Sequence, residues 1–222
     1  MRLTRQQIAA RVAQDIPDRA YVNLGIGVPT LVADYLPADR EIILHTENGM
    51  LGMGRAASPD EVDADLINAG KIYVTEVLGA AYFHHADSFA MMRGGHIDYC
   101  VMGGYQVSVG GDLANWRTNS TTSIPGVGGA MDLAAGAKHV YVVMDLFTKS
   151  GECKLVQHCT YPLTGAECVE RVYSDVAVFE LAEGEVRLLD LFDDELSIKK
   201  LSDLIGSPIR DVRQPVLSDI HA

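Results

Sequence analysis

The chain has 222 residues, of which 48% are hydrophobic and 22% charged, and thirty acidic residues against eighteen basic ones leave a net charge of −12. This balance argues against nucleic-acid binding, which depends on neutralising phosphates, but leaves room for a small anionic ligand in a local cationic pocket. No segment holds the roughly 18 uninterrupted apolar residues that a membrane-spanning helix needs. The first residues also lack the apolar core of a signal peptide, so we expect a cytoplasmic protein without a membrane partner.

The first half of the chain alternates helical and extended patterns. Apolar residues at helical spacing predict a helix over residues 4–16, with Thr4 as its N-cap. A short buried strand over residues 21–25 breaks into a glycine turn, and Pro29 opens a second helix that runs to residue 36. Further strands are predicted over residues 41–45 and 73–77. Residues 52–59, which contain glycine and proline, are predicted to be a loop.

The second half continues the alternation. Helices are predicted over residues 87–93, 130–137 and 194–204, and strands over residues 99–102, 107–109 and 139–144. The segments 176–181 and 186–191 flank a glycine turn and predict a hairpin. Apolar runs without clean alternation are typical of strands buried on both faces. We therefore predict one α/β domain over residues 1–222, a three-layer structure with a largely parallel sheet of mixed edge and helices on both faces.

Cysteines and histidines give no sign of a metal centre or a disulfide framework. The four cysteines lack C-x-x-C spacing and are interpreted as reduced thiols: Cys100, Cys153, Cys159 and Cys168. His84 and His85 are adjacent, and neighbouring residues of a strand point to opposite faces, so the pair cannot easily bind one ion. We expect a polar loop there and no metal.

Glu47 is the strongest candidate for a reactive residue. It follows an apolar strand directly, where open α/β sheets place their ligand crevices. Three glycines follow it, at positions 49, 52 and 54, and let backbone approach a ligand closely. A partly desolvated glutamate at such a place can act as a nucleophile or base. The alternative is a glutamate that caps a nearby helix.

Two further glycine-rich segments could bind a ligand. Gly128 and Gly129 precede a predicted helix, where successive amides can stabilise developing negative charge, although a close contact between helix and strand explains them equally well. Residues 23–30 form a strand, a glycine loop and a helix, a partial dinucleotide fingerprint that is better interpreted as a tight turn. Lys71 is either a surface lysine or a phosphate-binding cation.

Several motifs in the same order resemble the B (beta) subunits of 3-oxoacid CoA-transferases, from about Gln6 to Gly206. The matching motifs lie at residues 23–29, 47–49, 65–71, 88–96, 111–116 and 128–132. Residues 83–89 and 159–165 are most similar to the B subunits that act on 3-oxoadipate. The family motif usually has serine where this chain has Thr46, which keeps the hydroxyl.

The resemblance implies a CoA-transferase fold and transfer of CoA from succinyl-CoA to a 3-oxoacid, with 3-oxoadipate as the expected acceptor. It implies that Glu47 attacks the donor thioester and becomes a glutamyl-CoA thioester, with ping-pong kinetics. Gly128 and Gly129 would donate amides to the tetrahedral intermediate, and Asn23 and Lys71 would contact CoA or shape its site. No cofactor would be permanently bound, because CoA esters are substrates. A separate A (alpha) subunit would complete a hetero-oligomer.

Three alternatives stay open. The acceptor could be acetoacetate or another 3-oxoacid, since a dicarboxylate needs a group for its distal end, such as His84, His85, Arg93 or a group of the partner chain. The chain could be a non-catalytic CoA-binding assembly subunit, because fold alone does not fix function. Water could also reach the Glu47 thioester and make the protein a CoA-ester hydrolase.

Overall fold

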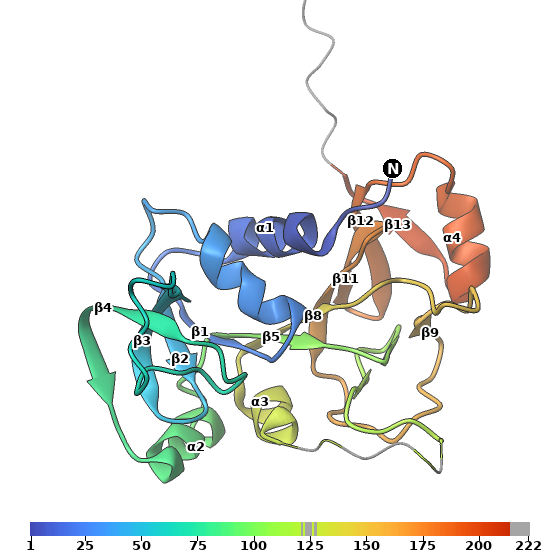
Figure 1. Ribbon diagram of the computed structural model, residues 1–222. Coiled ribbons are helices and arrows are strands. Elements are labelled where there is room, and N and C mark those ends of the chain that lie inside the picture. The colour runs from blue at the N-terminus through green and yellow to red at the C-terminus, as the bar shows by residue number, and fades with distance from the viewer. Residues whose placement is uncertain (121, 123–125, 127, 214–222) are drawn as a thin grey trace, which may run out of the picture.

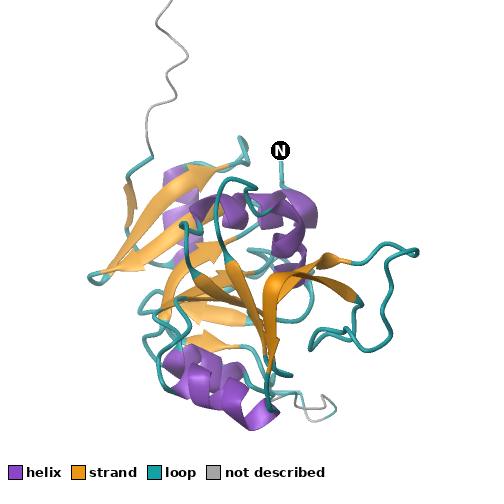
Figure 2. Cartoon of the chain, turned by 90° about the vertical axis from the view of Figure 1, so that its left-hand side faces the viewer, coloured by secondary structure: helices purple, strands orange, loops and turns teal. Residues whose placement is uncertain are grey.

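The computed structural model describes residues 1–120, 122, 126 and 128–213. These residues form a ten-stranded sheet with helices on both faces, and a separate three-stranded sheet (Figures 1 and 2). The helices are α1 (Arg5–Asp15), the 3-10 helix η1 (Val28–Tyr35), α2 (His85–Arg93), α3 (Ala130–Gly136) and α4 (Ile198–Ile205). The described part of the chain contains no helix of the length and apolar character that a membrane crossing requires.

The large sheet has the strand order β13-β12-β11-β10-β8-β5-β1-β2-β3-β4. Its strands are β1 (Tyr21–Leu24), β2 (Ile43–Thr46), β3 (Met50–Ala56), β4 (Val74–Tyr82), β5 (Tyr99–Gly103), β8 (His139–Val143), β10 (Val169–Tyr173), β11 (Ala177–Ala182), β12 (Glu185–Leu191) and β13 (Ile209–Asp211). The small sheet contains β6 (Gln106–Ser108), β7 (Leu113–Ala114) and β9 (Leu155–Val156). The five central strands β10, β8, β5, β1 and β2 are parallel, and antiparallel pairs flank them on both sides. The predicted α/β class with a mixed edge is therefore confirmed.

Two apolar cores lie on opposite faces of the large sheet. One packs beneath α1 and η1, and the other beneath α2, α3 and α4. Strand β8 contributes side chains to both cores: Val140 and Val142 belong to one, and Tyr141 and Val143 belong to the other. A strand buried on both faces needs an unbroken apolar run, and each fully buried aliphatic side chain contributes roughly 1.5–3 kcal/mol.

The predicted helix at the start of the chain is confirmed with its cap. The Thr4 hydroxyl accepts a hydrogen bond from Gln7 N, and the Gln7 side chain accepts one from Thr4 N, which closes a capping box. The hairpin of β11 and β12 is confirmed as an antiparallel pair. The helix predicted from Pro29 exists as the 3-10 helix η1, and α4 begins at Ile198, later than predicted.

The prediction of a loop over residues 52–59 is wrong for most of that segment, because β3 extends to Ala56. The glycines that suggested a loop allow β4 to pass close to β3. A Cβ on Gly52 would lie 3.0 Å from Ala80 Cα, and one on Gly54 would collide with Thr75 Oγ1. Glycine in a strand often marks such a close backbone approach rather than a break.

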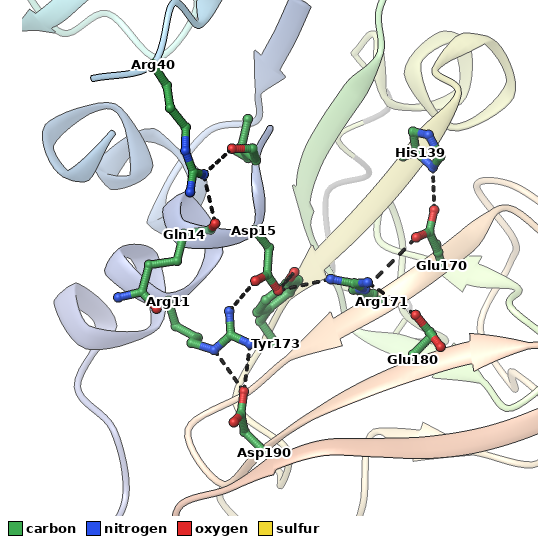
Figure 3. Close-up of polar contacts among 11 residues, drawn as sticks. Arg11, Gln14, Asp15, Arg40, His139, Glu170, Arg171, Tyr173, Glu180 and Asp190 are labelled. Atoms are coloured by element: carbon green, nitrogen blue, oxygen red, sulfur yellow. Dashed lines mark hydrogen bonds and ion pairs between the residues drawn. The ribbon is translucent and has the colours of Figure 1, made fainter. Parts of the chain in front are cut away.

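A network of ion pairs attaches α1 to the sheet (Figure 3). Asp15, at the end of α1, accepts hydrogen bonds from Arg171 at 3.0 Å and from the Tyr173 hydroxyl at 2.7 Å. Arg11 donates to Asp15 at 2.6 Å and to Asp190 of β12 at 2.8 Å. Because most of these side chains are shielded from solvent, the network fixes α1 over β10 and β12.

The last strand at one end of the large sheet, β4, presents an apolar edge. Leu78 is fully exposed, and the exposed fractions of Val77 and Tyr82 are 49% and 57%. Two neighbouring side chains before the strand, Ile72 and Tyr73, are exposed as well. Figure 1 shows β4 at the outer left of the molecule, beyond β3.

Candidate active site

A pocket of about 440 Å³ lies where four parallel strands end. Its lining includes one residue that follows or ends each strand: Gly25 after β1, Glu47 after β2, Gly103 of β5 and Met144 after β8. The start of α3 also contributes to the lining. The carboxyl ends of parallel strands are the usual position of a ligand crevice in an open α/β sheet.

Glu47 occupies a tight turn that joins β2 to β3. Gly49 N donates to Thr46 O at 3.1 Å across the turn, and Met50 N donates to Thr46 Oγ1 at 3.1 Å. Phe83 N donates to Gly49 O at 3.0 Å. Gly49 has φ +111°, and a Cβ there would collide with Phe83 O, so only glycine fits. The Thr46 hydroxyl, a group that serine also has, stabilises the turn by accepting the hydrogen bond from Met50 N.

The Glu47 carboxylate is half-buried, and no hydrogen bond reaches it from the described residues. Burial raises the pKa of Glu47, because a carboxylate loses solvation there; His85 lowers this pKa and Asp132 raises it. A carboxylate with little solvation is a better nucleophile than one in water. The turn presents the Glu47 carboxylate toward the pocket.

Gly128 and Gly129 lie at the start of α3, and both line the pocket with Glu47. A Cβ on Gly129 would lie 2.9 Å from both Cδ and Oε1 of Glu47, and 3.1 Å from Cζ of Phe89. Gly128 has φ +48° and open space where its Cβ would be. The structure thus brings the three predicted catalytic residues together. Amide donation by the glycines stays a prediction.

The two residues predicted to contact CoA lie in different surroundings. Asn23 is 2% exposed and bonded to His45, and it lines a narrow cavity that also reaches Glu47. Lys71 is exposed with φ +62° and follows Gly70, which lines the same narrow cavity. Contacts of Asn23 and Lys71 with CoA stay predictions.

Other residues of the site were not predicted from the sequence. Lys154 and Arg5 line the main pocket, and burial lowers the pKa of Lys154 while Asp145 raises it. His45 and Ser88 lie beneath the Glu47 turn and are almost completely buried. Their hydrogen-bond partners lie far away in the sequence, so no local pattern marks either residue.

A half-buried glutamate against a glycine at the start of a helix, in a pocket at the strand ends, fits an enzyme of acyl transfer. Residues 5–192 match the family Coenzyme A transferase, and the chain belongs to that family.

Curated relatives match almost the whole chain. The B subunit of 3-oxoadipate CoA-transferase from Pseudomonas putida is 57% identical over 208 residues, which are 94% of this chain and 97% of the relative. The protein of the same name from Acinetobacter baylyi is 52% identical and covers 96% of this chain and 98% of its own length. The B subunit of the probable succinyl-CoA:3-ketoacid coenzyme A transferase from Bacillus subtilis is 48% identical, with 87% and 89% covered. The chain is thus a CoA-transferase subunit of the B type.

Solved structures share the fold. The acyl-CoA transferase apoenzyme of Escherichia coli O157:H7 superposes with a TM-score of 0.68 at 19% identity, and the match covers 96% of this chain but 42% of that protein. Glutaconate coenzyme A-transferase from Acidaminococcus fermentans superposes with a TM-score of 0.64 at 14% identity, with 96% and 89% covered. At these identities the structural likeness concerns the fold alone.

Proposed function

We propose that this chain is the nucleophile-bearing subunit of a two-subunit enzyme that moves CoA from succinyl-CoA to 3-oxoadipate. One observation carries the proposal: the half-buried Glu47 carboxylate sits on a tight turn against Gly129, inside the pocket at the strand ends. Membership in the coenzyme A transferase family supplies the reaction class.

The reaction proceeds through two exchanges at Glu47. Its carboxylate attacks the thioester carbonyl of succinyl-CoA, which gives an acyl-glutamyl anhydride and releases CoA thiolate. The thiolate attacks the Glu47 carbonyl, and succinate leaves from a glutamyl-CoA thioester. The acceptor carboxylate then attacks this thioester, and the released thiolate takes the acceptor acyl group from the new anhydride. Each step passes through an oxyanion, which the Gly128 and Gly129 amides stabilise.

His85 is the residue that we assign to the distal carboxylate of the acceptor. Of the three sequence candidates, His84 accepts a hydrogen bond from Ala86 N at 3.1 Å, and Arg93 pairs with Asp132 at 2.6 Å. The His85 ring instead packs against the Phe89 ring, with 4.8 Å between centroids, and the electrostatic effect of His85 lowers the pKa of Glu47. It makes no hydrogen bond to a described residue, so it can bind an anion.

Acetoacetate or another 3-oxoacid is the second candidate acceptor, because the Bacillus subtilis relative is named for a 3-ketoacid rather than for 3-oxoadipate. Specificity constants for 3-oxoadipate and acetoacetate distinguish the two. We expect 3-oxoadipate to be preferred, and we expect His85→Ala to reduce kcat/KM for 3-oxoadipate while leaving that for acetoacetate nearly unchanged. A strong preference of the wild-type enzyme for acetoacetate would overturn the choice of acceptor.

The first experiment traps the covalent intermediate. The chain is mixed with its A subunit in the presence of succinyl-CoA, quenched with borohydride or hydroxylamine, and the modified peptide is mapped by mass spectrometry. We expect modification at Glu47 that depends on succinyl-CoA. Glu47→Gln should abolish both the adduct and turnover, whereas the control Glu41→Gln, at an exposed residue before β2, should retain both.

Three results would count against the proposal. A folded and assembled enzyme that forms no Glu47 adduct would favour a non-catalytic CoA-binding subunit. Full activity of the purified chain without its A-type partner would refute the assignment to a two-subunit enzyme. Release of CoA from the adduct by water, without an acceptor, would indicate hydrolysis.

A further inference from the structure

A chain of buried hydrogen bonds runs beneath the Glu47 turn. Asn23 Nδ2 lies 3.0 Å from His45 Nδ1 and 3.3 Å from His45 O. The other ring nitrogen, His45 Nε2, lies 3.0 Å from Ser88 Oγ, and Ser88 Oγ donates to Thr46 O at 3.0 Å. The exposed fractions of Asn23, His45 and Ser88 are 2%, 1% and 0%. Three elements, β1, β2 and α2, thus meet at the residue before Glu47.

Only one placement of protons satisfies all of these contacts. The Asn23 amide nitrogen can only donate, so His45 Nδ1 must accept and His45 Nε2 must carry the proton. Nε2–H then donates to Ser88 Oγ, and the single Ser88 hydroxyl proton goes to Thr46 O. A second proton on the ring would face the Asn23 amide hydrogens, so the imidazole is neutral. Burial agrees with this assignment, because it lowers the pKa of His45 to about 4.

We infer that His45 and Ser88 are positioning residues, which hold the Glu47 turn at the distance from Gly129 that acyl transfer requires. The inference rests on the proposed function, because it assigns a role to groups that act through Glu47. Both ring nitrogens of His45 and the Ser88 hydroxyl are used inside the protein, so neither residue is left to bind substrate.

The position of Ser88 explains why this contact matters for catalysis. Ser88 belongs to α2, and α2 packs against α3, whose N-cap is Gly129. The bond from Ser88 to Thr46 O therefore couples the turn that carries Glu47 to the helix pair that carries Gly129. Phe89, the next residue on α2, packs against Gly129: its Cζ lies 3.1 Å from the point where a Cβ on Gly129 would be. A misplacement of about 1 Å at a reacting group costs about 10²-fold in rate.

The test measures acylation in the enzyme assembled from both subunits. Ser88→Ala and His45→Leu remove links of the chain, and His45→Gln keeps one acceptor and one donor. Ser174→Ala is the matched control, because Ser174 is 1% exposed, donates to Ala177 O at 2.7 Å and lies in the turn between β10 and β11. For each variant, Tm, KM for succinyl-CoA, kcat and the single-turnover rate of Glu47 modification are measured.

We expect Ser88→Ala and His45→Leu to lower kcat and the acylation rate by about 10–100-fold, with KM changed by about 2-fold or less. His45→Gln should restore most of the rate. Ser174→Ala should lower Tm as much as Ser88→Ala does and leave kcat unchanged. If Ser88→Ala does not assemble, Ser88→Cys keeps the volume and weakens the donor.

Two results overturn the inference, and they can be told apart. Normal acylation in Ser88→Ala or Ser88→Cys and in His45→Leu, with an adduct present in the wild type, refutes the positioning role alone. Absence of the Glu47 adduct in the wild type refutes the proposed function, and the positioning role fails with it.

Discussion

Replacing Gly129 by alanine tests the contact between α3 and the candidate nucleophile most directly. Gly129 has φ −84° and ψ 6°, a conformation that is allowed for alanine, so the main effect of the change is the added methyl group. That methyl carbon would lie 2.9 Å from Glu47 Cδ and Oε1, whereas ordinary contacts begin at 3.4 Å. Glu47 must therefore move by about 0.5 Å (3.4 − 2.9) or more.

The expected effect falls on the reaction more than on folding. A displacement of 0.5–1 Å at a reacting carboxylate predicts a loss of about 10–100-fold in the rate of Glu47 acylation. The cost in stability should stay near 1 kcal/mol, because glycine and alanine differ modestly at an N-cap and a half-buried side chain can yield. Rapid-quench acylation with succinyl-CoA measures the first quantity, and chemical denaturation measures the second.

Gly110→Ala is the control for the added methyl group. Its Cβ would meet only Ser108 Oγ, at 3.7 Å, and its φ lies outside the left-handed region. We expect this variant to acylate at the wild-type rate. If Gly129→Ala acylates as fast as Gly110→Ala, the Glu47 carboxylate does not react from the position described above, and the reasoning is refuted.

Three further predictions concern charged and titrating groups. The acylation rate should fall as pH drops through the pKa of Glu47, above the ordinary 4.5; His85→Ala should shift this inflection upward and Asp132→Asn downward in pH–rate profiles. The pKa of His45 falls from 6.5 to about 4 on folding. As the pH is lowered, His45 is therefore protonated in the unfolded chain before it is protonated in the folded chain. The unfolding free energy should therefore drop by about 1.4 kcal/mol between pH 7.5 and 5.5, and His45→Gln should lack this component in denaturation curves. Arg171→Leu should cost about 3 kcal/mol in the same assay, because Asp15 loses a shielded partner.

Each of these predictions has a result that contradicts it. If neither His85→Ala nor Asp132→Asn shifts the inflection in the pH–rate profile, neither residue acts on the pKa of Glu47. Equal pH dependence of stability in wild type and His45→Gln would mean that His45 titrates normally in the fold. Arg55, whose pair with Glu61 is exposed, is the control for Arg171: Arg55→Leu should cost far less stability than Arg171→Leu, and an equal cost would refute the special role of Arg171.

Local pattern was sufficient to predict most helices and four of the five central parallel strands, because a strand such as β8, buried on both faces, needs an unbroken apolar run. Strand β10 was not predicted. Local pattern was also insufficient for β3, where Gly52 and Gly54 suggested a loop. Their real role depends on β4, whose approach no neighbouring residue reveals. Packing against a strand distant in the sequence therefore determines that this segment is a strand rather than a loop.

In the candidate site, too, some residues could be predicted from local pattern and others could not. Glu47 could be found because a carboxylate between an apolar run and several glycines is a local signal. His45 and Ser88 could not, because their hydrogen bonds join residues 22 and 43 positions apart. The place of Gly129 against Glu47 likewise follows from the packing of α2 on α3.

The apolar edge of β4 has a practical consequence for anyone who handles this chain. An edge strand with a fully exposed leucine offers unpaired backbone groups and apolar side chains to any other strand, which is the usual starting point of aggregation. Expression of the isolated chain should therefore favour inclusion bodies or soluble aggregates. Leu78→Lys places a charge of the kind that natural edge strands use as protection, and it should raise the soluble yield without disturbing the core.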